Sequence, residues 1–156
     1  MAQLFRPGDV ISLSGDLGAG KTTFVQGLAK GLGVQDRVTS PTFALIKEYQ
    51  VRNSELENRN SKSPGLRLHH FDLYRLMSFE ELYDLGYEEY FYGLGITVIE
   101  WGEKIAPLLP KVFLEIKITQ QLSENVREIE IIPHGSRWDK LVHKWLKQNE
   151  VEQPKT

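Results

Sequence analysis

The sequence predicts a single α/β domain in which helices flank a mixed, mostly parallel β-sheet. A strand is predicted at residues 9–14, and an apolar run of strand length at residues 96–99 is typical of a strand buried on both faces of a parallel sheet. Residues 112–118 and 126–132 alternate apolar and polar side chains, which is typical of half-exposed antiparallel neighbours. The length of 156 residues is that of one domain, which we expect over residues 1–148.

A strand, a glycine loop and a helix follow one another near the start of the chain. Residues 9–14 predict the strand, and residues 15–22 match the pattern G-x-x-x-x-G-K-[ST] in full. Residues 22–32 carry apolar side chains at helical spacing, and Gly33 is placed to end the helix. Glycines let backbone N–H groups approach a polyphosphate, and the helix N-terminus adds partial positive charge. The motif is therefore a phosphate-binding loop, or P-loop, of a nucleotide hydrolase or kinase.

The P-loop motif predicts a role for several of its residues. Lys21 is expected to reach the β- and γ-phosphates, and the Thr22 hydroxyl is expected to coordinate Mg²⁺. The full set of expected nucleotide contacts in the loop is Gly15, Asp16, Leu17, Gly18, Ala19, Gly20, Lys21, Thr22 and Thr23.

The middle of the chain predicts a hairpin with an elongated tip. A polar loop at residues 37–42 leads into a strand at 43–51, and a second strand is expected at 66–71. Residues 53–65 between them are almost without apolar side chains, so we expect a mobile polar insertion there. We expect a disordered tail at residues 149–156.

Three helices complete the predicted domain. Residues 78–81 fit a capping box that opens a short helix ending near Gly86, and residues 87–92 predict a second short helix. The last helix, at residues 137–148, places five apolar side chains on one stripe that we expect to pack in the core. These are Trp138, Leu141, Val142, Trp145 and Leu146.

Two acidic residues stand where ligands bind in open α/β sheets, at the carboxyl ends of strands. Asp72 follows the strand at 66–71, and Glu100 follows the apolar strand at 96–99. Each can hold Mg²⁺ directly, hold it through water, or orient an attacking water, and the sequence leaves these roles open. For Asp72 a turn or capping role is the structural alternative.

Composition excludes several classes of protein. The net charge of −2 argues against a stand-alone nucleic-acid binder, and the absence of cysteine excludes disulfides and thiolate metal sites. No apolar run approaches membrane-spanning length, and residues 1–7 do not resemble a signal peptide. We therefore expect a cytoplasmic protein that does not engage a membrane.

Four blocks of the sequence together resemble the TsaE family, also called YjeE. They are the P-loop run G-D-L-G-A-G-K-T-T at 15–23, S-P-T-F at 40–43, H-F-D-L-Y-R-L at 70–76 and I-E-W at 99–101. Their order and spacing match the family over roughly residues 8–118, and the H-F-D-L-Y-R block is more specific than the P-loop. Family members usually carry another strand and helix ahead of the P-loop, whereas residues 1–8 alone precede the first strand here.

The resemblance implies an ATPase that acts in threonylcarbamoyl modification of the adenosine beside the anticodon in ANN-decoding tRNAs. It implies that the protein binds ATP and Mg²⁺, joins the proteins TsaB and TsaD, and meets tRNA through that complex. Carried onto this sequence, the resemblance implies Lys21, Thr42, Asp72 and Glu100 as catalytic residues, with Thr42 as a switch-like residue near the γ-phosphate. It also implies Thr22 and Glu100 at the metal and Trp101 beside the nucleotide.

Two other functions remain open alternatives. A small-molecule kinase would use Asp72 as a base, but such kinases usually carry an arginine-bearing lid, and residues 101–117 contain no arginine. A GTP-dependent switch would use an N-K-x-D loop, and no asparagine here precedes a lysine.

Some weaker signals have a structural and a functional interpretation. Arg75 is either a built-in arginine finger or half of a structural ion pair. His69 and His70 are adjacent on a strand, so they point to opposite faces and favour structural roles over a metal site. A basic face on the last helix is either solvated or meets tRNA phosphates; its residues are Lys140, His143, Lys144 and Lys147.

Overall fold

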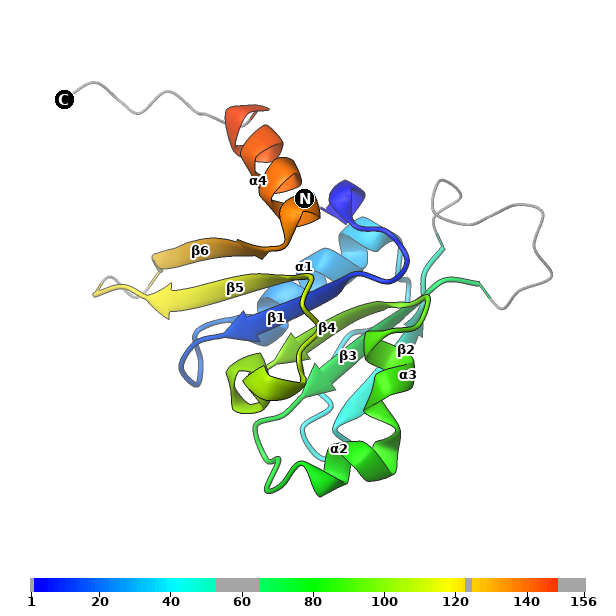
Figure 1. Cartoon of the computed structure of the whole chain (residues 1–156). Helices are drawn as coiled ribbons and strands as arrows, with labels where there is room; N and C mark the ends of the chain where they lie inside the picture. Colours follow the sequence, from blue (N-terminus) through cyan, green and yellow to red (C-terminus); the bar gives the residue numbers. More distant parts are fainter. Residues whose placement is uncertain (1, 53–64, 123–124, 149–156) are drawn as a thin grey trace.

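The computed structural model describes residues 2–52, 65–122 and 125–148, and a six-stranded sheet with flanking helices forms within these ranges (Figure 1). The strands are β1 Val10–Ser14, β2 Ile46–Gln50, β3 Arg67–Asp72, β4 Ile96–Glu100, β5 Phe113–Gln120 and β6 Arg127–His134. The α-helices are α1 Lys21–Leu32, α2 Glu80–Leu85, α3 Tyr87–Phe91 and α4 Ser136–Gln148. Two 3₁₀ helices, η1 Ala2–Leu4 and η2 Gly102–Leu108, lie ahead of β1 and after β4.

The sheet has the strand order β2-β3-β4-β1-β5-β6. The four central strands, β3, β4, β1 and β5, run parallel to one another, and the edge strands β2 and β6 pair antiparallel with β3 and β5. The mixed, mostly parallel α/β sheet expected from the sequence is thus confirmed. The β2–β3 and β5–β6 pairings also confirm the expected hairpin and the expected antiparallel neighbours.

Helices cover both faces of the sheet. Side chains of α1 and α4 pack with the strands in one apolar cluster, and side chains of α2, α3 and η2 pack in a second cluster. In Figure 1, α1 passes behind the sheet, while α2 and α3 lie in front of it. Every residue of β4 is buried as a result, which explains why residues 96–99 are apolar except for Thr97, whose hydroxyl donates to the Tyr90 carbonyl.

The helix ends agree with the sequence. Gly33 and Gly86 adopt left-handed conformations directly after α1 and α2, as a C-terminal cap requires. The capping box at residues 78–81 forms only in part, because Phe79 occupies the N-cap position and no side-chain cap bond is made there. The other half of the box does form, because the Glu81 carboxylate accepts hydrogen bonds from the backbone N–H groups of Ser78 and of Met77.

Two expectations about elements are wrong in detail. Strand β2 begins at Ile46 rather than Phe43, because Leu45 has a φ of 63° and residues 41–44 form a turn closed by Ala44 N–H and Pro41 O. Phe43 is consequently 87% exposed rather than on a buried face. The apolar stripe of α4 packs in the core at Trp138, Leu141 and Val142, but Leu146 near its end is half exposed because α4 projects away from the sheet (Figure 1).

Most of the expected insertion at 53–65, and the whole expected tail at 149–156, lie outside the described residues. None of the helices within the described ranges is both long enough and apolar enough to span a membrane.

Candidate functional site

The glycine loop connects β1 to α1 at the carboxyl end of the parallel strands. Gly15 has a φ of 143°, and a Cβ atom there would lie 2.3 Å from the carbonyl oxygen of Ile118 on β5. Gly20 precedes α1 with a φ of 110°, a conformation that side chains with a Cβ rarely adopt. The loop can therefore pack against β5 and turn into α1 only with glycine at these two positions.

Lys21 is the first residue of α1 and is buried in the loop. Its Nζ donates hydrogen bonds to the carbonyl oxygens of Gly15, at 2.5 Å, and Asp16, at 2.9 Å. The ammonium also lies 3.8 Å from the centre of the Trp101 ring. Burial lowers the pKa of Lys21, and the negative charge of Glu100 opposes that shift. The loop thus holds one desolvated cation where an anion would meet it.

Thr22 and Glu100 meet across the site. The Thr22 hydroxyl donates to the Glu100 carboxylate, 2.8 Å from Oε1 and 3.0 Å from Oε2. Glu100 ends β4 and is buried, and its Oε1 also lies 2.8 Å from Nε2 of His70 on β3. A hydroxyl from the P-loop and a carboxylate from a neighbouring strand therefore share one small volume.

Asp72 ends β3 and is the register partner of Glu100. Its Oδ2 accepts hydrogen bonds from the hydroxyls of Ser40 and Thr42, the latter at 2.9 Å, and its Oδ1 accepts one from the Tyr74 N–H at 3.0 Å. The Tyr74 contact is the turn-stabilising one that the sequence left open. The Ser40 and Thr42 contacts tie the loop after α1 to the same carboxylate, so Asp72 both stabilises a turn and faces the site.

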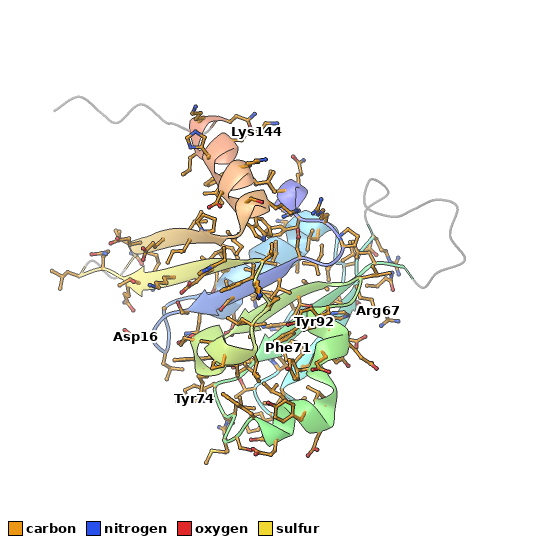
Figure 2. The ribbon with its side chains drawn as sticks, in the orientation of Figure 1. Asp16, Arg67, Phe71, Tyr74, Tyr92 and Lys144 are labelled. Atoms are coloured by element: carbon orange, nitrogen blue, oxygen red, sulfur yellow. The ribbon has the colours of Figure 1, made fainter. Side chains whose placement is uncertain are left out.

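These side chains line a cleft of about 310 Å³ at the carboxyl end of the parallel strands. Its lining residues are Leu17, Gly18, Gly20, Lys21, Thr22, Thr23, Ser40, Thr42, Asp72, Tyr74, Glu100 and Trp101. Figure 2 shows Asp16 on the glycine loop and Tyr74 after β3 at this same end of the sheet. Of the expected site residues, Gly15, Asp16 and Ala19 support the loop without lining the cleft, and all the others line it.

A second hollow of about 430 Å³ lies on the other flank of the glycine loop. Gly18, Gly20 and Thr23 line both hollows. The second hollow is completed by side chains of α1 and of the β5–β6 hairpin, among them Phe24, Ile118 and Ile129. It is more apolar than the first, and the two hollows adjoin through the three loop residues that they share.

Sequence reasoning missed Ser40 and His70 as parts of the site. The two histidines do point to opposite faces, since His69 contacts Tyr90 of α3 and Thr97. His70 instead reaches Glu100 on the α1 face. The period of two residues along a strand places His70 on the same face as Asp72, and this spacing was the signal that could have found it.

Two weaker signals lie outside the cleft. The Arg75 guanidinium lies 4.4 Å from the centre of the exposed Phe43 ring, and Arg75 does not line the cleft. The four residues of the basic face of α4 are exposed, and one of them, Lys144, lies far from Asp16 and Tyr74 in Figure 2.

The parallel sheet, the glycine loop with its lysine and threonine, and the acidic residues at neighbouring strand ends define a P-loop NTPase-type domain. The sequence model of the family described as threonylcarbamoyl adenosine biosynthesis protein TsaE matches residues 1–129. The chain belongs to this family.

Individual relatives agree with the family match. The chain is similar to the tRNA threonylcarbamoyladenosine biosynthesis protein TsaE of Treponema pallidum, with 43% identity over 131 residues, 84% of this chain and 87% of the relative. The protein of the same name from Bacillus subtilis is 39% identical over 150 residues, 96% of this chain and 85% of the relative. The crystal structure of Bacillus subtilis YdiB is similar, with a TM-score of 0.70 and 35% identity, covering 96% of this chain and 84% of that chain.

Proposed function

We propose that this protein binds ATP with Mg²⁺ in the cleft and hydrolyses it as a step in threonylcarbamoyl modification of tRNA adenosine. The names of its relatives, which describe tRNA threonylcarbamoyladenosine biosynthesis, support the pathway. The geometry of the cleft supports the chemistry. The modified position, beside the anticodon of ANN-decoding tRNAs, follows from the family resemblance, and a tRNA substrate implies a cytoplasmic protein.

The observation that carries the proposal is the contact between the Thr22 hydroxyl and the Glu100 carboxylate. Mg²⁺ in phosphate-transfer sites takes one or two protein oxygens and completes its shell with phosphates and water. The described residues contain no group of three or more acidic, histidine or cysteine ligands, and this donor set does not need one. Thr22 and Glu100 fit the ion as ligands. When bound, Mg²⁺ would neutralise charge on the β- and γ-phosphates.

Lys21 and the backbone of the loop would bind the phosphates. The Lys21 ammonium already lies over the loop, where the Gly15 and Asp16 carbonyls accept its hydrogen bonds. A phosphate oxygen carries full negative charge and competes well against neutral carbonyls for these donors. The first N–H groups of α1 have no partners within the helix and point to the same place.

Asp72 would orient the attacking water, with Ser40 and Thr42 as neighbours. An ionised carboxylate accepts hydrogen bonds only, so the hydroxyls of Ser40 and Thr42 are its donors at present. A γ-phosphate in the cleft offers the Thr42 hydroxyl a second acceptor. If the Thr42 hydroxyl turned to the phosphate, Asp72 Oδ2 would be free to accept a proton of the attacking water. The loop after α1 would then respond to the γ-phosphate, which is what a switch-like role for Thr42 requires.

We place the adenosine in the second hollow. A polyphosphate that lies over Gly18, Gly20 and Thr23 connects the cleft to that hollow, since these residues line both. Phe24, Ile118 and Ile129 supply apolar surface for a base. Trp101 lies away from this hollow, next to Lys21, so we expect it to lie near the phosphates of the nucleotide and not near the base.

TsaB and TsaD are the proposed partner proteins, and the protein would contact tRNA indirectly, through the complex with them. The cleft is open, and Leu17 and Tyr74 on its lining are exposed. Phosphoryl transfer depends on positioning and on water exclusion, so an open site is slow until a partner covers it. We expect the isolated protein to bind MgATP and to turn it over slowly.

The test is phosphate release from ATP and from GTP, measured with and without TsaB and TsaD. We expect slow hydrolysis of ATP alone and faster hydrolysis once both partners are present. Transfer of the γ-phosphate to an added acceptor instead of water would support the kinase alternative, and a preference for GTP binding without turnover would support the switch. A rate that is already maximal alone and unchanged by the partners would contradict the proposed role.

A further inference from the structure

A buried histidine on β3 lies directly behind the proposed metal ligands. His70 is two residues before Asp72, and its register partner Val98 is two residues before Glu100. Alternate residues of a strand share a face, so His70 lies on the same face of the sheet as both carboxylates. His70 is fully buried and does not line the cleft, so it can act on the site only through a neighbour.

That neighbour is Glu100. Nε2 of His70 lies 2.8 Å from Oε1 of Glu100, and an ionised carboxylate has no proton to give, so Nε2 carries the proton and donates. Nδ1 is buried and has no hydrogen-bond partner in the part of the chain that the structure describes. A ring protonated at Nε2 alone therefore fits this position, and it is held in one orientation.

His70 holds one oxygen of the Glu100 carboxylate. Oε1 accepts from His70 and also lies 2.8 Å from the Thr22 hydroxyl, while Oε2 lies 3.0 Å from that hydroxyl and receives no hydrogen bond from His70. A glutamate side chain has three rotatable bonds, and a fixed donor on one oxygen removes most of that freedom. Carboxylates that bind metals are commonly held in this way, and loss of the holding group typically costs about 10–100-fold in metal affinity.

The neighbouring histidine shows what a purely structural role would be. His69 is also buried, but it packs edge-on against Tyr90 and pairs with Thr97 on the opposite face. His70 has its hydrogen bond with a group of the site itself. Burying an imidazole among apolar strand residues has a cost, and the bond to Glu100 is what offsets it.

We propose that His70 is a positioning residue: its ring holds Glu100 beside the Thr22 hydroxyl and so sets the affinity of the nucleotide site for Mg²⁺. The inference rests on the proposed function. It predicts an effect on metal-dependent binding rather than on nucleotide binding as such, because His70 does not reach the cleft.

The experiment compares His70→Gln with His70→Asn in the full chain. The amide nitrogen of glutamine can take the place of Nε2 and donate to Glu100, whereas that of asparagine occupies the place of Nδ1 and cannot reach it. His69→Asn serves as the matched control on the opposite face. For each protein, ATP affinity is measured by calorimetry in EDTA and over a Mg²⁺ series, and thermal melting verifies that it is folded.

Mg²⁺ should raise the ATP affinity of every folded protein in the series. In His70→Asn, the Mg²⁺ concentration that gives half of this increase should be about tenfold or more higher than in the wild type, and the ATP affinity in EDTA should be unchanged. His70→Gln should restore most of the wild-type Mg²⁺ dependence, and His69→Asn should keep it. The inference is overturned if folded His70→Asn keeps the wild-type dependence, if His70→Gln is as impaired as His70→Asn, or if His69→Asn gives the same shift. Should His70→Asn not fold, a glutamine variant with impaired Mg²⁺ dependence still overturns it. A wild-type protein whose ATP affinity does not respond to Mg²⁺ would contradict the proposed function instead.

Discussion

Asp72 and Glu100 are neighbours in the sheet and both are buried, but their carboxylates have different partners. Glu100 contacts the P-loop hydroxyl of Thr22, whereas Asp72 contacts the loop that carries Ser40 and Thr42. The first arrangement suits a metal ligand, and the second suits a group that responds to the γ-phosphate and handles water. At the scale of residues, the site therefore separates binding of the metal from the chemical step.

The two carboxylates should differ when they are replaced one at a time. Glu100→Ala should weaken ATP affinity in Mg²⁺ but leave affinity in EDTA unchanged, because the residue acts through the metal. Asp72→Ala should abolish most hydrolysis while sparing MgATP affinity, because the residue acts in the chemical step. Calorimetry and phosphate release measure the two effects. Full ATPase activity in either variant would contradict its place in the site, and equal losses of affinity would contradict only the division of roles.

Lys21→Ala should weaken nucleotide binding strongly and leave the fold intact. A hydrogen bond to a charged group contributes about 1.5–3 kcal/mol, so we expect affinity for ATP to fall by roughly ten- to a hundredfold. Stability should change little, because Lys21 is a desolvated cation whose partners are loop carbonyls. Lys30→Ala, at the exposed end of the same helix, is the control. Unchanged ATP affinity and turnover in a folded Lys21→Ala protein would refute the assignment of the cleft.

Among the elements, the β2–β3 hairpin is held together by the hydrogen-bonded ladder between its two strands. The ladder runs from Ile46↔Phe71 to Gln50↔Arg67, and the Val51 N–H continues it by donating to the Leu66 carbonyl at 2.9 Å. The sequence predicts the two strands from their patterns. It could not predict that Leu45 adopts a left-handed conformation, because the Asp72 N–H donates to the Leu45 carbonyl from a distant part of the chain.

The insertion at residues 53–64 should be dispensable for the chemistry. An Asn-Gly turn in its place would close the ladder beyond Val51 and Leu66 with a four-residue loop that includes Arg52 and Gly65. Loop-closure entropy changes by only about 0.6 kcal/mol for each doubling of length, so we expect the melting temperature to stay within about 4 °C. ATPase activity and binding to TsaB and TsaD should be retained, with a scrambled insertion of the same composition as control. A larger loss of stability, or loss of partner binding, would show that the native segment is used.

Across the whole molecule, an ion pair joins the beginning of the domain to its last helix. Arg137 of α4 lies 2.8 Å from Oδ2 of Asp9, just ahead of β1, and Asp9 is buried. Burial raises the pKa of Asp9, and the Arg6 N–H and the Arg137 charge both oppose that shift. Because the partners are 128 residues apart, no local pattern in the sequence reveals the pair.

Removing Arg137 should destabilise the fold most at neutral pH. Breaking a buried pair typically costs about 3–5 kcal/mol, because the remaining charge is left uncompensated. In Arg137→Ala the pKa of Asp9 should rise further, so the excess cost should shrink as the pH falls and Asp9 takes up a proton. Urea unfolding across a pH series measures this. Asp9→Asn in the Arg137→Ala background should recover stability at neutral pH, and Lys140→Ala on exposed α4 is the control. A cost that is independent of pH would contradict this account.

The sequence by itself determined the elements whose information is local. The P-loop needs glycines, a lysine and a threonine at fixed spacing, and β4 needs an apolar run because both faces of a central parallel strand are covered. These requirements can be read over a few residues, and they were enough to predict the fold class; the family was predicted separately, from the resemblance of four sequence blocks. Position at a strand end likewise predicted that Asp72 and Glu100 would come together.

Only the tertiary structure decided which groups those residues touch. The partners of Glu100 come from 78 residues away in Thr22 and 30 residues away in His70, and Ser40 reaches Asp72 across 32 residues. Such contacts depend on strand order and on how the loop after α1 folds over the sheet, and neither follows from periodicity or local propensity. The physical reason is that spacing along a strand determines the face on which a side chain lies, while the packing of separate elements determines its partners.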